Sequence, residues 1–151
     1  MKFSTVMLGA FIIFIGCDNV SGSLEQLPPE ELILGSWQVS FARIDNQVYP
    51  VTTPGFGQMR AIIAENTILY IYPDVDDNGL PTAKNDSLYA FWSFNNDNSL
   101  ITISNPQDNS TLLVWEVLNL SVGLLKTSYE AQSPSSTEAT STYELTYSLT
   151  E

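Results

Sequence analysis

Oxygen-bearing side chains alternate along a short acidic segment, residues 74–79, which reads Asp-Val-Asp-Asp-Asn-Gly. Oxygens at alternate positions can converge on a hard cation, and the glycine permits the sharp turn that such a loop needs. Calcium is favoured over magnesium, because a surface loop rarely offers the strict octahedron that magnesium requires. The spacing therefore predicts a calcium site, whose ligands we expect to be Asp74, Asp76, Asn78 and Asp86.

The closing half of this loop departs from the EF-hand pattern. Asn85 stands where a glutamate would complete that motif, and Asp86 comes one residue later. The flanking sequence also predicts strands where an EF-hand has helices. The alternative is a hairpin loop whose Asp, Asn and Gly residues simply favour turn geometry and water. Apart from calcium, no cofactor is expected.

Catalytic chemistry is limited by the absence of histidine and the presence of a single cysteine. Ser-His-Asp and Cys-His arrangements, and zinc sites built from His or several Cys, need residues that this chain lacks. A hydrolase with paired carboxylates stays open as an alternative, although carboxylates in solvated loops need no catalytic explanation. The sequence therefore predicts a protein that is not an enzyme.

The charge balance is strongly acidic, with 17 Asp and Glu residues against 5 Lys and Arg residues. Nucleic-acid binding needs a basic stripe that neutralises phosphates, and this chain offers none. The composition thus argues against nucleic acid as a partner and against lying flat on an anionic lipid surface. Solubility alone is a sufficient explanation of the acidity.

The N-terminal segment carries a targeting pattern. Lys2 precedes an apolar run over residues 6–15, and Gly16 and Cys17 follow it. A secretory signal has this order of a basic start, a short apolar stretch and a small residue before the cut. The segment resembles a bacterial lipoprotein signal, which implies that residues 1–16 are a signal peptide and that Cys17 receives acyl chains such as palmitate. The alternative is an ordinary signal peptide cut elsewhere, with Cys17 incidental.

This resemblance also implies a location and a first partner. The acyl chains would attach the protein to a membrane of the cell envelope, for which the outer membrane is the better prediction, with its periplasmic or surface face left open. Residues 17–31 are rich in Ser, Gly, Glu, Gln and Pro and show no period. We expect them to form a flexible, lipidated tether to a folded domain over residues 32–151.

Period-two alternation dominates this domain. Trp37, Val39 and Phe41 alternate with polar residues near its start, as do Tyr143, Leu145 and Tyr147 near its end. Short polar turns separate the β-rich runs, and two longer loops are expected over residues 46–57 and 73–86. The pattern predicts an all-β protein, an antiparallel up-and-down meander of about eight strands that closes into a barrel. The expected strands cover residues 36–41, 59–64, 67–72, 87–94, 100–104, 111–118, 122–129 and 143–150.

A family resemblance follows from four short motifs in order. These are Leu-Gly-Ser-Trp at 34–37, Ala-Phe-Trp-Ser-Phe at 90–94, Leu-Val-Trp-Glu-Val at 113–117 and Tyr-Glu-Leu-Thr at 143–146. They resemble lipocalins and the lipocalin-like lipoproteins of Bacteroidetes-type bacteria. The resemblance implies a non-enzymatic carrier of a small apolar or amphipathic molecule, with Gly35 letting the chain bend and Trp37 closing the barrel floor.

Inward aromatic residues either fill a small barrel or line a pocket. Arg43 continues the inward parity of Trp37 and Phe41, so we expect it at the barrel mouth, where it could meet an acidic headgroup. Arg43 or Arg60 could also cover an aromatic ring. The predicted ligand-binding residues are Trp37, Phe41, Arg43, Tyr70, Tyr72, Trp92 and Trp115.

An interaction module is the alternative function. In that case the barrel is filled, and the loops bind an envelope protein or a glycan. Phe56, between Gly55 and Gly57, is the expected centre of an exposed aromatic surface. In either case we expect a monomer.

Overall fold

Nine strands and two short helices make up the described part of the chain. The computed structural model describes residues 27–53, 55–75, 81–132 and 140–150. In chain order the elements are α1 (Pro29–Leu32), β1 (Gly35–Ile44), β2 (Gln47–Tyr49), the 3₁₀ helix η1 (Phe56–Gln58), β3 (Arg60–Ile63), β4 (Thr67–Val75), β5 (Pro81–Phe94), β6 (Leu100–Ser104), β7 (Thr111–Ser121), β8 (Leu124–Gln132) and β9 (Thr140–Thr150). Among these elements, no helix is long and apolar enough to cross a membrane.

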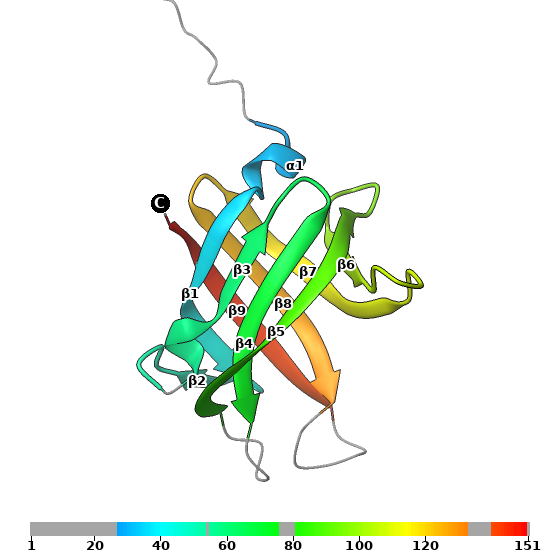
Figure 1. Cartoon of the computed structure of the whole chain (residues 1–151). Coiled ribbons are helices and arrows are strands. Elements are labelled where there is room, and N and C mark those ends of the chain that lie inside the picture. The colour runs from blue at the N-terminus through cyan, green and yellow to red at the C-terminus, as the bar shows by residue number, and fades with distance from the viewer. Residues whose placement is uncertain (1–26, 54, 76–80, 133–139, 151) are drawn as a thin grey trace, which may run out of the picture.

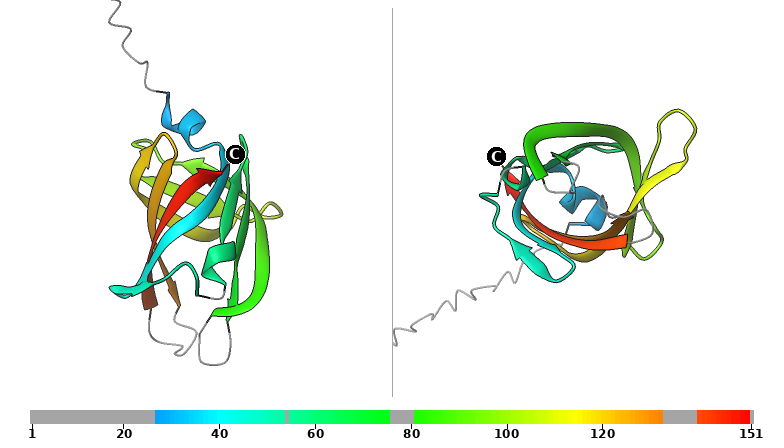
Figure 2. Two further views of the ribbon diagram at one scale, coloured as in Figure 1. Left: turned by 90° about the vertical axis from the view of Figure 1, so that its left-hand side faces the viewer. Right: turned by 90° about the horizontal axis from the view of Figure 1, so that it is seen from below.

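Eight antiparallel strands close into a barrel. Each strand from β3 to β8 pairs with the strand that follows it in the chain. Strand β1 pairs with both β3 and β9, which closes the ring (Figure 1). Strand β2 is an extra strand that pairs only with the end of β1. Seen from below, the strands surround the barrel axis and α1 lies at the far end (Figure 2). The predicted antiparallel meander of about eight strands is confirmed.

The two long loops predicted from the sequence are shorter than expected. Strand β2 lies inside the first of them, over residues 46–57. In the second, the pairing of β4 with β5 continues past Tyr72 and Asp86 to Pro73 and Asn85. Asp and Asn there suggested a loop, yet the ladder of backbone hydrogen bonds between two long strands outweighs their weak β-propensity.

Helix α1 lies against one end of the barrel. Pro29 stands at its first position, where the missing N–H costs nothing, and Glu30 and Glu31 favour the first turn of a helix. Directly after it, the carbonyl of Ile33 accepts a hydrogen bond of 2.7 Å from the indole Nε1 of Trp37. Both side chains are fully buried, so this end of the barrel is closed.

Gly35 permits the turn from α1 into β1. Its φ of 138° is one that residues with a side chain rarely adopt. A Cβ atom at this position would also lie 2.6 Å from Cδ1 of Leu149 on β9. The backbone therefore requires glycine, and a larger residue would also displace the end of the Leu149 side chain.

The core fills the barrel from the closed end upward. Trp115 packs edge-on against Tyr70, with ring centres 5.3 Å apart, and lies 5.9 Å from the ring of Tyr147. Aliphatic side chains fill the space around these rings. The buried apolar residues are Ile33, Trp37, Val39, Ala42, Phe56, Met59, Ala61, Ile63, Ile68, Tyr70, Ala90, Trp92, Ile101, Ile103, Trp115, Leu125, Leu145 and Tyr147.

Candidate functional site

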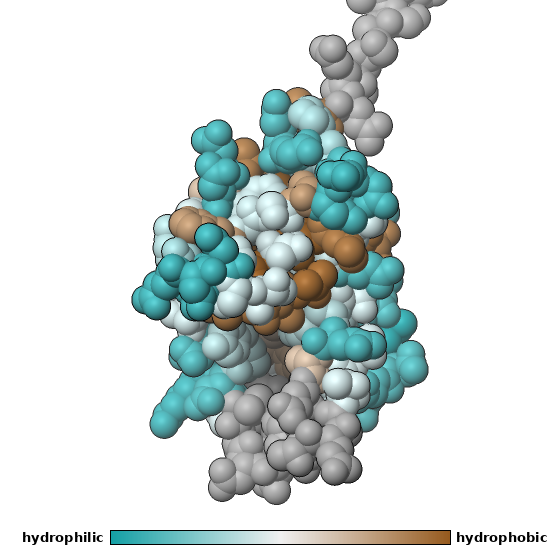
Figure 3. Space-filling model, turned by 90° about the vertical axis from the view of Figure 1, so that its right-hand side faces the viewer, coloured by the Kyte–Doolittle hydropathy of each residue, from teal (hydrophilic) through white to brown (hydrophobic). Residues whose placement is uncertain are grey.

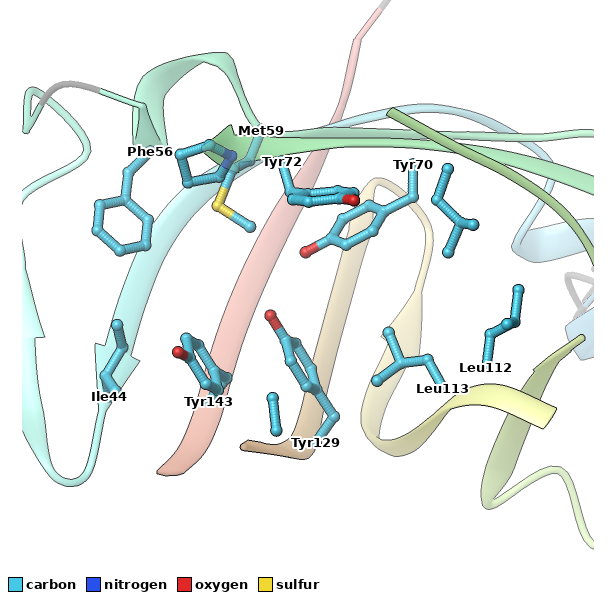
Figure 4. A pocket seen from close by; sticks show the side chains of 12 residues that line it. Ile44, Phe56, Met59, Tyr70, Tyr72, Leu112, Leu113, Tyr129 and Tyr143 are labelled. Carbon is cyan, nitrogen blue, oxygen red and sulfur yellow. The ribbon is translucent and has the colours of Figure 1, made fainter. Parts of the chain in front are cut away.

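A cavity of about 300 Å³ lies in the half of the barrel away from α1 (Figure 4). Its volume is at the lower end of the range for pockets that hold small molecules. The lining is almost entirely apolar or aromatic. It consists of Ile44, Phe56, Met59, Tyr70, Tyr72, Pro73, Leu88, Leu112, Leu113, Tyr129, Ala131 and Tyr143.

The cavity is built from strand ends. Ile44 is the last residue of β1, Leu113 lies near the start of β7 and Tyr143 near the start of β9. In an antiparallel barrel these positions meet at one end, and the period of two along each strand turns alternate side chains inward. The sequence places Trp37 at the other end of β1, so the same strand contributes to the closed end and to the cavity.

Helix η1 brings two further apolar side chains into the site. Phe56 and Met59 are both buried, and the Phe56 ring lies 5.6 Å from the ring of Tyr49. The prediction that Phe56 forms an exposed aromatic surface is wrong. The two glycines beside it favoured a solvent-facing turn, but Gly55 adopts a φ of 93° that turns the segment toward the barrel.

Four tyrosines give the cavity its polar groups. Tyr70 and Tyr72 lie on β4, with ring centres 5.6 Å apart. Tyr129 and Tyr143 stack on the facing wall at 4.9 Å with nearly parallel rings. Tyr129 was absent from the predicted binding residues, although the alternation Leu125, Thr127, Tyr129 on β8 would have indicated its inward direction.

Burial keeps these phenols neutral. It is the main cause that raises the pKa of Tyr70 and Tyr129 well above the ordinary value of 10.0, and the neighbouring tyrosine hydroxyls add to the effect. The pKa of Tyr72 is also raised, by burial and then by the carboxylate of Asp86, which accepts a hydrogen bond of 3.4 Å from its hydroxyl. At neutral pH the site therefore offers hydroxyl groups and no phenolate.

The predicted ligand-binding residues divide into three groups. Tyr70 and Tyr72 line the cavity. Trp37, Trp92 and Trp115 face inward as expected, but they are buried in the core and lie outside the cavity lining. The indole Nε1 of Trp92 donates a hydrogen bond of 2.7 Å to the carbonyl of Ala64. These tryptophans thus close and fill the barrel.

The inward placement predicted for Phe41 and Arg43 is wrong. The pairing of β1 with β9 shifts register between Val39 and Phe41, which marks a bulge. A bulge moves the following side chains to the opposite face. Ala42 is therefore fully buried, and Phe41 and Arg43 point outward.

Arg43 takes part in an ion-pair cluster on the outer surface. Its guanidinium lies 3.2 Å from the carboxylate of Glu144, which also contacts the ammonium of Lys126. The side chain of Lys126, followed by that of Arg43, holds the pKa of Glu144 below its ordinary value. The Cζ atom of Arg43 lies 5.6 Å from the centre of the Phe41 ring, which confirms that Arg43 covers an aromatic ring.

The predicted calcium ligands and lipidation site lie largely outside the described residues. Asp76, Asn78 and Cys17 are not described. Asp74 on β4 and Asp86 on β5 are exposed and stand near the two ends of the loop. Within the described ranges, no cluster of three or more His, Cys, Asp or Glu side chains forms a metal site. Calcium binding remains a prediction.

Comparison with solved structures gives the fold a name. An odorant-binding protein from bovine nasal mucosa superposes with a TM-score of 0.50 at 11% identity, over 83% of this chain and 76% of that one. A bovine odorant-binding protein complexed with its natural ligand gives 0.49 at 13% identity, over 84% and 76%. A dog lipocalin allergen gives 0.46 at 13% identity, over 77% and 72%. The barrel is lipocalin-like, and at these identities the likeness concerns the fold alone.

The comparisons at the level of sequence find no counterpart. No family model and no curated protein matches this chain.

Proposed function

We propose that this protein binds a small apolar or amphipathic molecule inside its barrel and carries it without chemical change. The observation that carries the proposal is the cavity of about 300 Å³, lined by 12 residues of which none is charged. An apolar ligand that binds there removes apolar surface of both the ligand and the protein from water. Each Å² of apolar surface buried in this way contributes roughly 25 cal/mol to binding.

The filled closed end supports the same proposal. Buried tryptophans and aliphatic side chains fill that half of the barrel, and α1 lies against its end. The cavity therefore has a closed floor. A pocket with a rigid floor binds better than a loose one, because less ordering is needed when the ligand enters.

We further propose that the protein is anchored to the outer membrane through acyl chains on Cys17, as the lipoprotein-like signal implies. Helix α1 is the first described element and lies at the closed end (Figure 1). The cavity lies at the opposite end, away from the point at which the N-terminal segment joins the barrel. Replacement of Cys17 by Ser should abolish incorporation of a labelled fatty acid and release the protein from the membrane fraction.

Native mass spectrometry of the protein purified from its own host tests the carrier function. A small apolar molecule that stays bound in gentle conditions and dissociates on unfolding is the expected result. A bare protein mass, together with no saturable binding of an apolar fluorophore, would overturn the proposal.

A second candidate function rests on the outer surface. Large apolar side chains are exposed there, Tyr89 at 59% among them. Figure 3 shows an apolar area on the face that carries β6 and β7, and Val114 on β7 is among the exposed apolar residues. Such a surface suits an interaction module that binds an envelope protein or a glycan. A protein that binds no small molecule but co-purifies with one envelope partner would favour this function over the first.

A further inference from the structure

The polar atoms at the inner end of the cavity carry information about the ligand. We propose, on the basis of the carrier function above, that the cavity selects neutral molecules with a hydroxyl or carbonyl group, which hydrogen-bonds to the buried hydroxyl of Tyr70. The rest of such a ligand would lie against the apolar lining toward the mouth, beside Met59 and Leu113.

Tyr70 is the lining residue whose polar atom lacks a partner. Its side chain is 4% exposed, and no hydrogen bond of normal geometry reaches its hydroxyl, although the hydroxyls of Tyr129 and Tyr147 lie near enough to influence its pKa. Figure 4 shows this hydroxyl pointing into the cavity, toward the hydroxyl of Tyr129 on the facing wall. A buried hydroxyl without a partner is unfavourable, so a ligand that supplies one gains more there than it would at a solvated site.

Three further unpartnered atoms lie behind Tyr70. They belong to the hydroxyl of Tyr147, the indole Nε1 of Trp115 and the hydroxyl of Thr127. Trp115 contacts both Tyr70 and Tyr147, so these groups form one cluster around its ring. None of these three residues lines the cavity, so Tyr70 is the member of the cluster that a ligand can reach.

The charges around the cavity exclude an ionised head group. No charged side chain lines the cavity among the residues that the structure describes. The carboxylate bonded to its wall is that of Asp86, through Tyr72. A carboxylate ligand would lose its hydration without meeting a cation and would approach a protein of net charge −12. A cationic ligand would likewise lack a counter-charge next to Tyr70. The neutral phenols match a neutral ligand group instead.

Three ligands that share a butylphenyl group and differ in the substituent opposite the butyl chain test the proposal: butylbenzene, 4-butylphenol and 4-butylbenzoate. Their dissociation constants are measured by calorimetry with the full-length protein. We expect 4-butylphenol to bind about fivefold more tightly than butylbenzene, as one net hydrogen bond allows, and 4-butylbenzoate to bind at least about tenfold more weakly.

Two variants assign the preference to one hydroxyl. Tyr70→Phe should remove the preference for 4-butylphenol and leave the affinity for butylbenzene unchanged. Tyr89→Phe is the matched control, because Tyr89 is exposed on β5 and lies outside the cavity lining. It should leave the preference intact. Tyr70→Phe should also fold with unchanged or raised stability, since it removes an unpartnered hydroxyl.

The outcomes separate this inference from the carrier function. If butylbenzene and 4-butylphenol bind equally, a water molecule or nothing satisfies Tyr70, and the inference fails while the carrier function stands. Equal losses in the Tyr70→Phe and Tyr89→Phe variants would overturn the assignment to Tyr70. If neither neutral ligand binds, the carrier function fails and this inference fails with it.

Discussion

The two ends of the barrel are built from the same strands but differ in how their interiors are filled. At the closed end, Trp37 is fully buried and bonded to Ile33 beside α1. At the open end, the inward side chains of β1, β4, β8 and β9 surround a cavity of about 300 Å³. One end therefore contributes mainly packing, and the other leaves apolar surface free for a ligand.

This difference shows how one fold divides stability from binding. Tryptophans occupy the closed half, where each large ring has contacts on all sides. Tyrosines and aliphatic residues line the open half, where the polar groups are the hydroxyls of four tyrosines. Substitutions should therefore affect stability at one end and affinity at the other.

Truncation at the closed end should have the largest effect on stability. Trp37→Ala removes a fully buried ring and leaves the carbonyl of Ile33 without its donor. We expect the free energy of unfolding to fall by about 3–5 kcal/mol. Denaturant unfolding measures the loss, and the folded fraction should still bind butylbenzene. A loss below about 1 kcal/mol would contradict the role of Trp37 as the floor.

Filling the open end should abolish binding with little cost in stability. In Leu113→Trp the larger ring would occupy the cavity, so we expect the affinity for butylbenzene to fall by about thirtyfold or more, equivalent to about 2 kcal/mol. Stability should change by less than about 1.5 kcal/mol, because the ring enters existing space. Val114→Trp is the control on the outer face of β7, where Val114 is exposed, and it should bind normally. If both variants bind equally, the ligand lies elsewhere.

The entry into β1 should tolerate only glycine. Gly35→Ala places a Cβ against Leu149 and demands a φ of 138°. We expect a loss of about 1–2 kcal/mol in unfolding free energy, with affinity unchanged. In a double-mutant cycle, Leu149→Ala should recover the steric part of the loss and leave the backbone part. Full recovery would show that the backbone conformation is not strained.

The outer ion-pair cluster should have the smallest effect, and one that depends on pH. Because the pKa of Glu144 is lowered in the folded state, its contribution is complete above the ordinary value of 4.5 and is lost as the pH falls through the lowered value. Glu144→Gln should cost about 0.5 kcal/mol at neutral pH and nothing in stronger acid. Thermal unfolding of the wild-type protein and of the Glu144→Gln variant, each at neutral and at acidic pH, measures this difference in stability. A difference that persists in acid would point to packing instead of charge.

The closed end could be predicted from the sequence, and the open end only in part. Alternating residues and polar turns predicted the strand order, because both depend on local period and residue type. The barrel floor at Gly35 and Trp37 was predicted from the resemblance to lipocalins. The inward direction predicted for Phe41 and Arg43 was wrong because a bulge in β1 reverses which side chains face inward. The composition of the strand gives no sign of such a bulge. The burial of Phe56 depends on how its loop folds back in three dimensions, where its ring lies 5.6 Å from that of Tyr49, and no local pattern reveals this.

The cavity itself also lies beyond sequence reasoning. Whether aromatic side chains fill a barrel or leave a space depends on the sum of their volumes and directions in three dimensions. The pattern indicated that Tyr70, Trp92 and Trp115 face inward. It gave no means to separate Tyr70, which lines the cavity, from the two tryptophans, which lie in the core.

The most direct test of the central claim is to map where butylbenzene binds, by intermolecular nuclear Overhauser effects in the labelled protein. We predict contacts from the ligand to the methyl groups of Met59 and Leu113, and none to Ile33 beside α1. Contacts confined to outward side chains such as Val114, or the absence of any saturable contact, would contradict the claim that the open end of the barrel is a ligand site.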